Sequence, residues 1–371
     1  MENKLHIVFW DIPFPADYGG VIDAFYRLKA LHLAGMDITI HCFQYGERQP
    51  NIELEKYCSK IFYYPRTTGW RGLHASLPYI VSSRSHPELL KNLCMDDAPI
   101  LFEGIHTTYF LNNPKLDKRH KLIRTHNVES AYYAQLSNNT KRLLKKIYYA
   151  WESNRLAIYE KSLQHAQGLF PIAKHDTSFF QNLYPKLPVM YTAAFHPFTE
   201  VISAIGQGNY CLYHGNLQIA ENEKAALFLI QEVFANTDFP LVIAGKNPSK
   251  NLMHLQSKNI QIMANPSDTE LNEWIRHAHI HVLPSFQTTG LKLKLLHALF
   301  AGRHCIANAE MLIGSDLEDA VILAKDANDF KKQIATYMKI PFTEADKEKR
   351  KQLLQAFSNA LNAQKIISTL H

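Results

Sequence analysis

PSFQTTGLKLKLLHALFAGRHCIAN, from Pro284 to Asn308, carries the clearest structural signal in the chain. Its order of residues predicts the end of a strand, a polar turn, a short apolar helix, a glycine break and a second strand. Lys292 and Lys294 fall in the first turn of that helix, where the partial positive charge of a helix N-terminus disfavours lysine. A phosphate bound there would explain both lysines. The alternative is a surface helix whose lysines point into water.

The composition limits the class of protein. The chain has 371 residues, 46% hydrophobic and 20% charged, which is typical of a globular protein of two domains. Its net charge of +6 is too small to indicate nucleic-acid binding, but it suits an anionic ligand or a negatively charged membrane surface. Five scattered cysteines indicate free thiols in a reducing compartment. Because a first strand at 5–10 leaves no room for a signal peptide and no run could span a membrane, we expect a cytoplasmic protein.

Short apolar strands alternate with amphipathic helices along the chain, which predicts parallel sheets with helices on both faces. The alternation weakens between 195 and 209, which indicates a linker. We therefore expect an α/β protein with two Rossmann-like, doubly wound domains that face each other across a cleft. The expected boundaries are 1–196, 209–345, and 346–371 for a C-terminal helix that packs back on the first domain. The expected strands are 5–10, 38–43, 61–64, 100–102, 121–125, 169–172, 189–191, 211–214, 241–244, 260–263, 280–283, 303–307 and 321–323.

Two more residues in the second half suit a phosphate-bearing ligand. Lys246 follows a predicted strand, so its amine is expected at the carboxyl edge of the sheet, where ligands of doubly wound folds bind. With Lys294 it would flank one cleft and hold a pyrophosphate without a metal ion. His297 lies on the same helical face as Lys294 and suits a ribose hydroxyl. The alternatives are a surface loop lysine and a histidine satisfied at a domain edge.

The loop after the first strand contains Gly19 and Gly20, whose small size lets a ligand approach the backbone and the next helix N-terminus. The loop is not a GxGxxG dinucleotide fingerprint, and the chain has no P-loop and no GxSxG elbow. His277, His279 and His281 alternate without a fixed acidic or cysteine partner, so no metal motif is predicted.

Polar residues also gather at two later strand ends of the first half. Such clusters are more often functional than polar residues in the middle of helices. His126 is the foremost candidate for a catalytic-site residue among them. The alternative is that these side chains cap helices and bond between strands. The cluster consists of Glu103, His106, Arg124, His126 and Glu129.

The predicted long helix at 141–164 mixes basic with apolar and aromatic residues. A helix of this kind can lie on an anionic membrane, which would give the protein a peripheral membrane contact. A core helix with a solvated basic face is the more common arrangement. The basic residues are Lys141, Arg142, Lys145, Lys146 and Arg155, and the others are Leu144, Ile147, Tyr148, Tyr149 and Trp151.

Five segments taken together resemble the family 4 retaining glycosyltransferases of the GT-B fold over nearly the full length. The five segments are the Gly19-Gly20 loop, THNVE at 125–129, YHGNL at 213–217 with Asn222, IAGKNPS at 243–249, and the stretch from Gly290 to Gly302. Only the last two of these are specific when taken singly.

The resemblance implies a cytoplasmic enzyme that moves a hexose, with retention, from a nucleotide-sugar donor to a glycan or lipid-linked acceptor in polysaccharide or glycoconjugate biosynthesis. The first domain would bind the acceptor and the second the donor, with no obligatory metal or cofactor and no nucleic-acid partner. Where the family has two glutamates seven residues apart, this chain has Thr289 and His297. The implied catalytic residues are His126, Lys246 and Lys294. The implied donor-binding residues are Gly19, Gly20, Gly215, Asn216, Lys246, Thr289, Gly290, Leu291, Lys292, Lys294 and His297, and the acceptor-site candidates are Glu103, His106, Arg124 and Glu129.

Two other interpretations stay open at this point. Because both glutamates are replaced, the chain could be a catalytically inactive GT-B protein that binds a nucleotide or a glycan. A sugar-nucleotide epimerase on the same architecture would need an acid/base carboxylate pair, for which only Glu103 and Glu129 are candidates.

Overall fold

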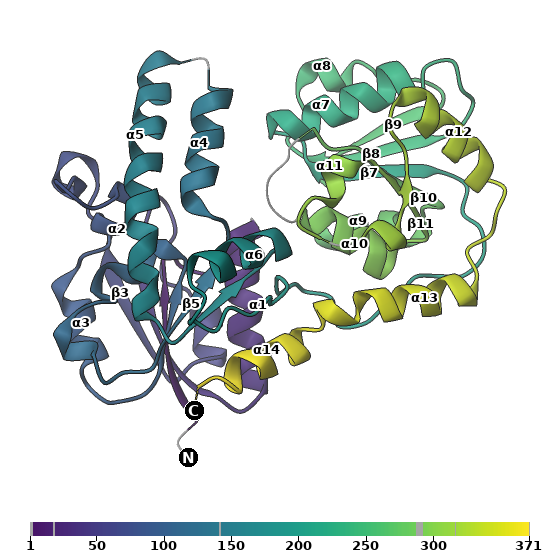
Figure 1. Cartoon of the computed structure of the whole chain (residues 1–371). Helices are drawn as coiled ribbons and strands as arrows, with labels where there is room; N and C mark the ends of the chain where they lie inside the picture. The colour runs from purple at the N-terminus through teal and green to yellow at the C-terminus, as the bar shows by residue number, and fades with distance from the viewer. Residues whose placement is uncertain (1–2, 18, 141, 287–291, 316, 371) are drawn as a thin grey trace. The chain divides into compact units, whose positions relative to one another are not determined.

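The computed structural model describes residues 3–17, 19–140, 142–286, 292–315 and 317–370 (Figure 1). The chain divides into two compact units, one formed by Met1–Pro197 with Ala356–His371 and the other by Phe198–Gln355. Each unit is built on one six-stranded sheet. Every pair of neighbouring strands in both sheets is parallel. The predicted α/β class with two doubly wound domains is therefore confirmed.

The first unit has the strand order β3-β2-β1-β4-β5-β6. The order reverses at β1, which pairs with β2 on one side and β4 on the other. Its strands are β1 Lys4–Phe9, β2 Asp37–Gln44, β3 Lys60–Pro65, β4 Ile100–Glu103, β5 Lys121–Thr125 and β6 Gly168–Pro171. Its α-helices are α1 Gly19–Leu33, α2 Tyr79–Ser82, α3 Pro87–Leu93, α4 Glu129–Asn139, α5 Leu143–Glu160, α6 Lys174–Leu183 and α14 Asn359–Ile367. Short 3₁₀ turns cover Ile52–Lys56, Gly69–Gly72, Ile105–Phe110, Pro114–Leu116, Lys161–His165 and Gln355–Phe357.

The second unit repeats this plan with the strand order β12-β11-β10-β7-β8-β9, which reverses at β7. Its strands are β7 Cys211–Asn216, β8 Leu241–Lys246, β9 Ile260–Ala264, β10 Ile280–Leu283, β11 His304–Ala307 and β12 Ile322–Leu323. Its α-helices are α7 Ala220–Phe228, α8 Lys250–Met253, α9 Asp268–His277, α10 Leu293–Ala301, α11 Ala309–Leu312, α12 Ala327–Tyr337 and α13 Glu344–Leu354. A π-turn at Leu229–Val233 follows α7, and a 3₁₀ turn covers Glu318–Ala320.

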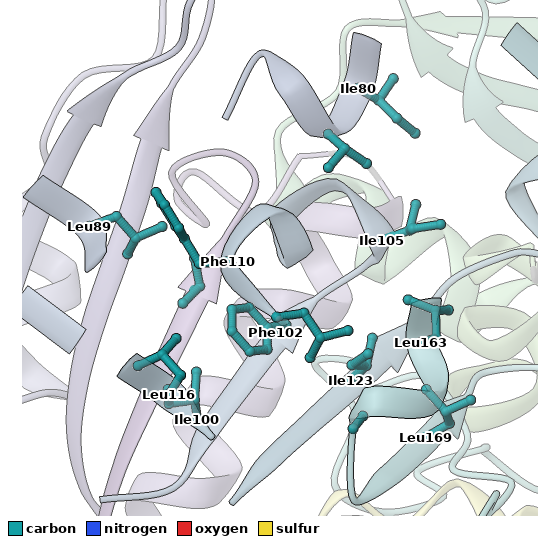
Figure 2. Packing of buried hydrophobic residues seen from close by; sticks show 14 of the residues in the cluster. Ile80, Leu89, Ile100, Phe102, Ile105, Phe110, Leu116, Ile123, Leu163 and Leu169 are labelled. Carbon is teal, nitrogen blue, oxygen red and sulfur yellow. The ribbon is translucent and has the colours of Figure 1, made fainter. Parts of the chain in front are cut away.

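Apolar residues cover both faces of the first sheet, because successive side chains of a strand point to opposite faces. In β4, Ile100 and Phe102 belong to one buried cluster, whereas Leu101 belongs to the cluster on the other face. Figure 2 shows the first of these clusters, in which Phe102 gathers with Ile123 of β5. Continuous apolar strands of this kind are typical of sheets buried on both sides, so the polar ends of the strands are where a ligand can bind.

The C-terminal segment crosses from one unit to the other. Helix α13 lies in the second unit, where a capping box formed by Thr343 and Asp346 begins it. Residues from Ala356 onward lie in the first unit, and Ala363 and Ile366 of α14 belong to the same apolar cluster as Leu5 of β1. The C-terminal segment was predicted to begin at 346, but the chain joins the first unit only from Ala356, ten residues later.

Candidate functional site

The reversal of strand order at β7 is the expected ligand position in the second unit, since doubly wound sheets bind ligands beyond the carboxyl ends of the strands at such a point. Strands β7 and β8 run in register to their ends, with Gly215 beside Gly245 and Asn216 beside Lys246. A side chain on Gly245 would collide with the carbonyl oxygen of Gly215. Glycine at 245 is therefore what lets the two strand ends approach each other.

Lys294 reaches this strand end from the first turn of α10. Its Nζ donates to Asn222 Oδ1 at 2.6 Å and to the Tyr213 hydroxyl at 3.0 Å. A Cβ atom placed on Gly215 would lie 3.4 Å from Nζ, so the amine sits directly over the backbone of β7. Among the described residues no carboxylate pairs with this ammonium group. Burial, reinforced by the nearby Lys292, lowers the pKa of Lys294 to about 8.

Lys246 and Lys292 are the other two lysines predicted to bind the donor. Lys246 is the last residue of β8 and its side chain is exposed. Lys292 precedes α10 and its Nζ donates to the backbone oxygen of Glu310 at 3.2 Å. Burial lowers the pKa of Lys292 to about 8. The predicted neighbours Thr289, Gly290 and Leu291 lie outside the described residues.

His297 follows Lys294 by one turn of α10. Its Nε2 lies 2.9 Å from Asn272 Oδ1 on α9, and its ring contacts Phe198 and His214 at centroid distances of 4.7 and 5.6 Å. Burial lowers its pKa to about 4, so the imidazole is neutral near pH 7. The adjacent ring of His214 is buried, and neither of its nitrogens has a partner among the described residues.

In the first unit, His126 and Glu103 form a dyad beyond the ends of β5 and β4. His126 Nε2 lies 2.5 Å from Glu103 Oε1, and the ring of Trp10 meets His126 edge-on at 4.8 Å. Glu103 is fully buried, so it orients the histidine instead of facing an acceptor. Burial lowers the pKa of His126 to about 3, which keeps its ring neutral.

Arg124 and Asp23 hold this dyad from inside the unit. The Arg124 guanidinium donates to both carboxylate oxygens of Asp23, at 3.2 and 2.8 Å, and to the backbone oxygens of Phe170, Thr192 and Ala193. Arg27 pairs with Asp23 and with Glu103. Because Arg124 is fully buried and its donors are occupied, it supports the strand ends and does not line the acceptor site as the sequence suggested.

Three groups of this cluster, Asp23, Glu103 and His126, bring ligand atoms within 4.8 Å of one another, close enough for a metal ion. Both carboxylates are already paired with arginine: Asp23 with Arg27 and Arg124, and Glu103 with Arg27. The two negative and two positive charges balance without a metal. The residues therefore form an ionic network rather than a set of free metal ligands.

The remaining acceptor-site candidates lie close to the dyad along the chain. Gly104, with φ of 64°, turns the backbone after β4, and His106 then packs against Trp10 at a centroid distance of 5.7 Å. Glu129 is the first residue of α4 and is buried. Burial, with Glu160 and Asp176 nearby, raises its pKa to about 7, so it can hold or release a proton near neutral pH.

The glycine loop lies at the start of α1. Gly19 is the first helical residue and has open space where a side chain would be. Arg48 fastens the preceding loop by donating to the backbone oxygen of Pro15 at 2.9 Å and by pairing with Asp11 and Asp17. Residues 11–17 of the loop are therefore held in place, and Gly19 at the start of α1 is exposed.

Several supporting residues were not predicted from the sequence. Asp23 and Arg27 are four residues apart on α1, a spacing that indicates an ion pair but not its pairing with Arg124. Asn272 and Trp10 gave no sequence signal, because their role depends on contacts with residues far away along the chain.

Comparison with known proteins agrees with this architecture. Residues 208–339 match the model of the family described as glycosyl transferases group 1. A Klebsiella pneumoniae protein described as an uncharacterized 44.6 kDa protein in the cps region is 28% identical over 364 residues, which cover 91% of each chain.

Solved glycosyltransferases share the fold at low identity. A glycosyltransferase from Rickettsia africae has a TM-score of 0.63 at 14% identity, covering 99% of this chain and 98% of the other. Sucrose-phosphate synthase from Thermosynechococcus elongatus has a TM-score of 0.62 at 13% identity, covering 99% and 94%. A UDP-forming α,α-trehalose-phosphate synthase from Burkholderia xenovorans has a TM-score of 0.60 at 10% identity, covering 99% of both. Residues 208–339 thus match a glycosyl transferases group 1 domain, and the chain as a whole has the GT-B fold of the solved glycosyltransferases.

Proposed function

We propose that the protein is a glycosyltransferase that moves a hexose from a nucleotide-sugar to a glycan or lipid-linked acceptor with retention of configuration. The observation that carries the proposal is Lys294. Its ammonium group is desolvated at the strand-order reversal of the second sheet and has two neutral partners, Asn222 and Tyr213. A buried cation without a carboxylate is unfavourable until an anion neutralises it. The diphosphate of a nucleotide-sugar is an anion of the right kind.

The proposed chemistry depends on charge neutralisation. As the bond between the anomeric carbon and the diphosphate oxygen breaks, negative charge develops on the leaving group, and Lys294 with Lys246 would stabilise it. The acceptor hydroxyl forms the new bond on the same face of the sugar and passes its proton to the leaving phosphate. Glu103 supports this route, because its carboxylate is buried against His126 and Arg27 and cannot act as a nucleophile. The lysines supply the charge that a metal would otherwise provide, so we propose no metal or cofactor.

The other residues have proposed positioning roles. His297 would accept a hydrogen bond from the ribose, and Gly215 and the exposed Asn216 at the end of β7 would lie beside the donor. We assign the acceptor to the carboxyl edge of the first sheet, where His126, His106 and Glu129 lie. The N-terminus of α1 at Gly19 and Gly20 would bind a sugar-phosphate group.

We also propose that the protein works in the cytoplasm, in the synthesis of a polysaccharide or other glycoconjugate, with a peripheral membrane contact. A lipid-linked acceptor would require such a contact. No helix in the described part of the chain is long and apolar enough to cross a membrane.

The test is a panel of UDP-, GDP- and other nucleotide-sugars with two readouts, the melting temperature and the release of nucleoside diphosphate. We expect a raised melting temperature with one nucleotide and release of that nucleotide once an acceptor is added. Lys294→Gln should weaken nucleotide binding about 10- to 100-fold, the loss expected for one buried charge-assisted contact.

Lys349→Gln, at an exposed position of α13, is the matched control and should bind as the wild type does. Equal nucleotide affinity in the wild type and Lys294→Gln would contradict the site. If the melting temperature rises with a nucleotide but no acceptor causes nucleotide release, the protein binds nucleotides and is not a transferase.

A further inference from the structure

Two segments of the first unit contain no acidic residue. Neither 66–87 nor 130–151 includes Asp or Glu, although charged residues make up 20% of the whole chain. The basic residues exposed or partly exposed in these segments are Arg66, Arg71, Arg142, Lys145 and Lys146. A surface of one sign, built over two separate stretches, favours an anionic partner.

The structure brings the two segments together. Arg155 of α5 pairs with the backbone oxygen of His74, and its guanidinium lies 4.2 Å from the ring centroid of Trp151. Nearby, the backbone N–H of Ile80 donates to Glu152 at 3.3 Å. The segment that contains His74 and Ile80 therefore packs against the middle of α5, at Trp151–Arg155.

Large apolar side chains lie exposed among these basic residues. Leu144 is 83% exposed, Trp70 77% and Leu143 70%, and Leu73, Ile147 and Trp151 are exposed as well. Leu143, Leu144, Ile147 and Trp151 recur at helical spacing and form one stripe on α5. Single exposed leucines are ordinary, but a cluster of this size indicates an interaction surface.

The opposite face of α5 is already occupied by α4, which stands beside it in Figure 1. Ser137 of α4 donates to the backbone oxygen of Lys146 at 3.0 Å, and Ser153 of α5 donates to that of Ser130 at 2.8 Å. Tyr133 and Tyr149 meet edge-on at 5.9 Å. The hairpin is therefore held together by its own contacts, and the apolar stripe remains available for a partner.

We propose that this face, defined by Trp70, Leu73, Leu143, Leu144, Ile147 and Trp151 with their basic neighbours, docks on an anionic lipid bilayer. A bilayer interface accepts leucine and tryptophan into its acyl boundary while lysine and arginine contact the headgroups. A nucleic acid would match the charge but would leave the exposed leucines in water. A second copy of the chain would match the leucines but would repel the basic residues.

The docking face gives the proposed peripheral membrane contact a location, and it is independent of the donor site. No helix in the part of the chain that the structure describes could span a bilayer, so the contact is made at the surface. The face holds the first unit, to which we assign the acceptor, against the lipid.

The experiment is co-flotation of the full chain with vesicles of phosphatidylcholine, with and without about 30% phosphatidylglycerol. Wild-type protein should float with the anionic vesicles at low salt and not with phosphatidylcholine alone. Leu144→Glu should reduce the bound fraction at least about tenfold, since it replaces an inserted apolar group by a charge that the bilayer repels. Lys145→Glu combined with Lys146→Glu should do the same at low salt and have less effect at high salt.

Ile52→Glu is the matched control, because Ile52 is 76% exposed elsewhere on the same unit. It should float as the wild type does. Each variant is also tested for its nucleotide-induced melting shift, which should be unchanged in all of them. Loss of that shift with flotation intact would contradict the proposed function and not the docking face.

Three results would overturn the docking face. The first is wild-type protein that fails to float with anionic vesicles at low salt. The second is equal flotation of Leu144→Glu and the wild type. The third is a dimer in solution that Leu144→Glu converts to a monomer, which would make the face a contact between copies of the chain.

Discussion

At the scale of single residues, the candidate donor site depends on neighbours that are themselves uncharged. Lys294 is held by an amide and a phenol, and His297 by an amide. None of these partners carries a charge, so each residue keeps its electrostatic capacity for a ligand. This differs from His126, whose partner Glu103 is a carboxylate that is itself paired with an arginine.

Nucleotide affinity should fall as the pH rises through about 8, because burial lowers the pKa of Lys294 to about 8 and only the ammonium form attracts a diphosphate. Calorimetric titration of the nucleoside diphosphate between pH 6.5 and about 9.5 would measure this. Lys294→Gln should remove most of the dependence. A constant affinity across that range would contradict the charged contact.

The Asn272 amide determines which ring nitrogen of His297 carries the proton. With Oδ1 facing the ring, Nε2 carries the proton and Nδ1 is left as an acceptor, the hydrogen-bonding role of a carboxylate. Asn272→Asp should raise the pKa of His297 from about 4, so nucleotide affinity should become dependent on pH between about 5 and 7. Wild type should show only the dependence caused by ionisation of the ligand's own phosphate, and Asn272→Leu should bind more weakly at every pH. An Asp-variant profile that matches the wild-type profile would exclude this role.

At the scale of elements, the succession of strands along the chain could be predicted from the sequence. The predicted strands at 5–10, 100–102, 241–244 and 280–283 correspond to β1, β4, β8 and β10, with ends that differ by a residue or two. The expected strand at 189–191 is an isolated bridge between Val189 and Leu169. The predicted helix at 141–164 ends as a 3₁₀ turn from Lys161.

Helix α1 is joined to the sheet by the ion pair between Asp23 and Arg124 of β5, which could not be predicted from the sequence of the helix. Asp23→Asn should reduce the free energy of unfolding of the first unit by about 3–5 kcal/mol, because Arg124 would be left buried without its counter-charge and Arg27 would keep only Glu103. Denaturant unfolding would measure the loss. Asp37→Asn, an exposed carboxylate at the start of β2, is the control and should change stability little.

At the scale of the whole molecule, buried ionisable groups make stability depend on pH. Nine of the described histidines have a pKa held below its usual value, mainly by burial: His6, His41, His106, His126, His214, His279, His281, His297 and His304. Four carboxyl groups have a raised pKa: Glu129, Glu152, Glu160 and Asp176.

The two sets act in opposite directions. A histidine with a lowered pKa binds protons more readily when unfolded, so stability is lost as the pH falls below about 6.5. A carboxyl group with a raised pKa contributes stability at low pH and loses it as the pH rises through its folded value, about 7 for Glu129. Because the histidines outnumber the carboxyl groups, we expect the melting temperature to fall between pH 7 and 5. A melting temperature that rises over this interval would contradict the burial of these histidines in a neutral state.

The sequence by itself determined the alternation of strands and helices, the two-domain α/β class, and the positions of Lys246, Lys294 and His126 at strand or helix ends. These features depend on local periodicity and on residues next to one another in the chain. Only the tertiary structure decided which of the polar residues are available. Arg124 looked like a ligand-binding residue, but contacts with Asp23 and three distant backbone carbonyls take up its donors. Among the described residues, the side chains that accept from Lys294 are the neutral Asn222 and Tyr213. Burial and partner choice arise between residues far apart in the chain, and the local pattern does not contain them.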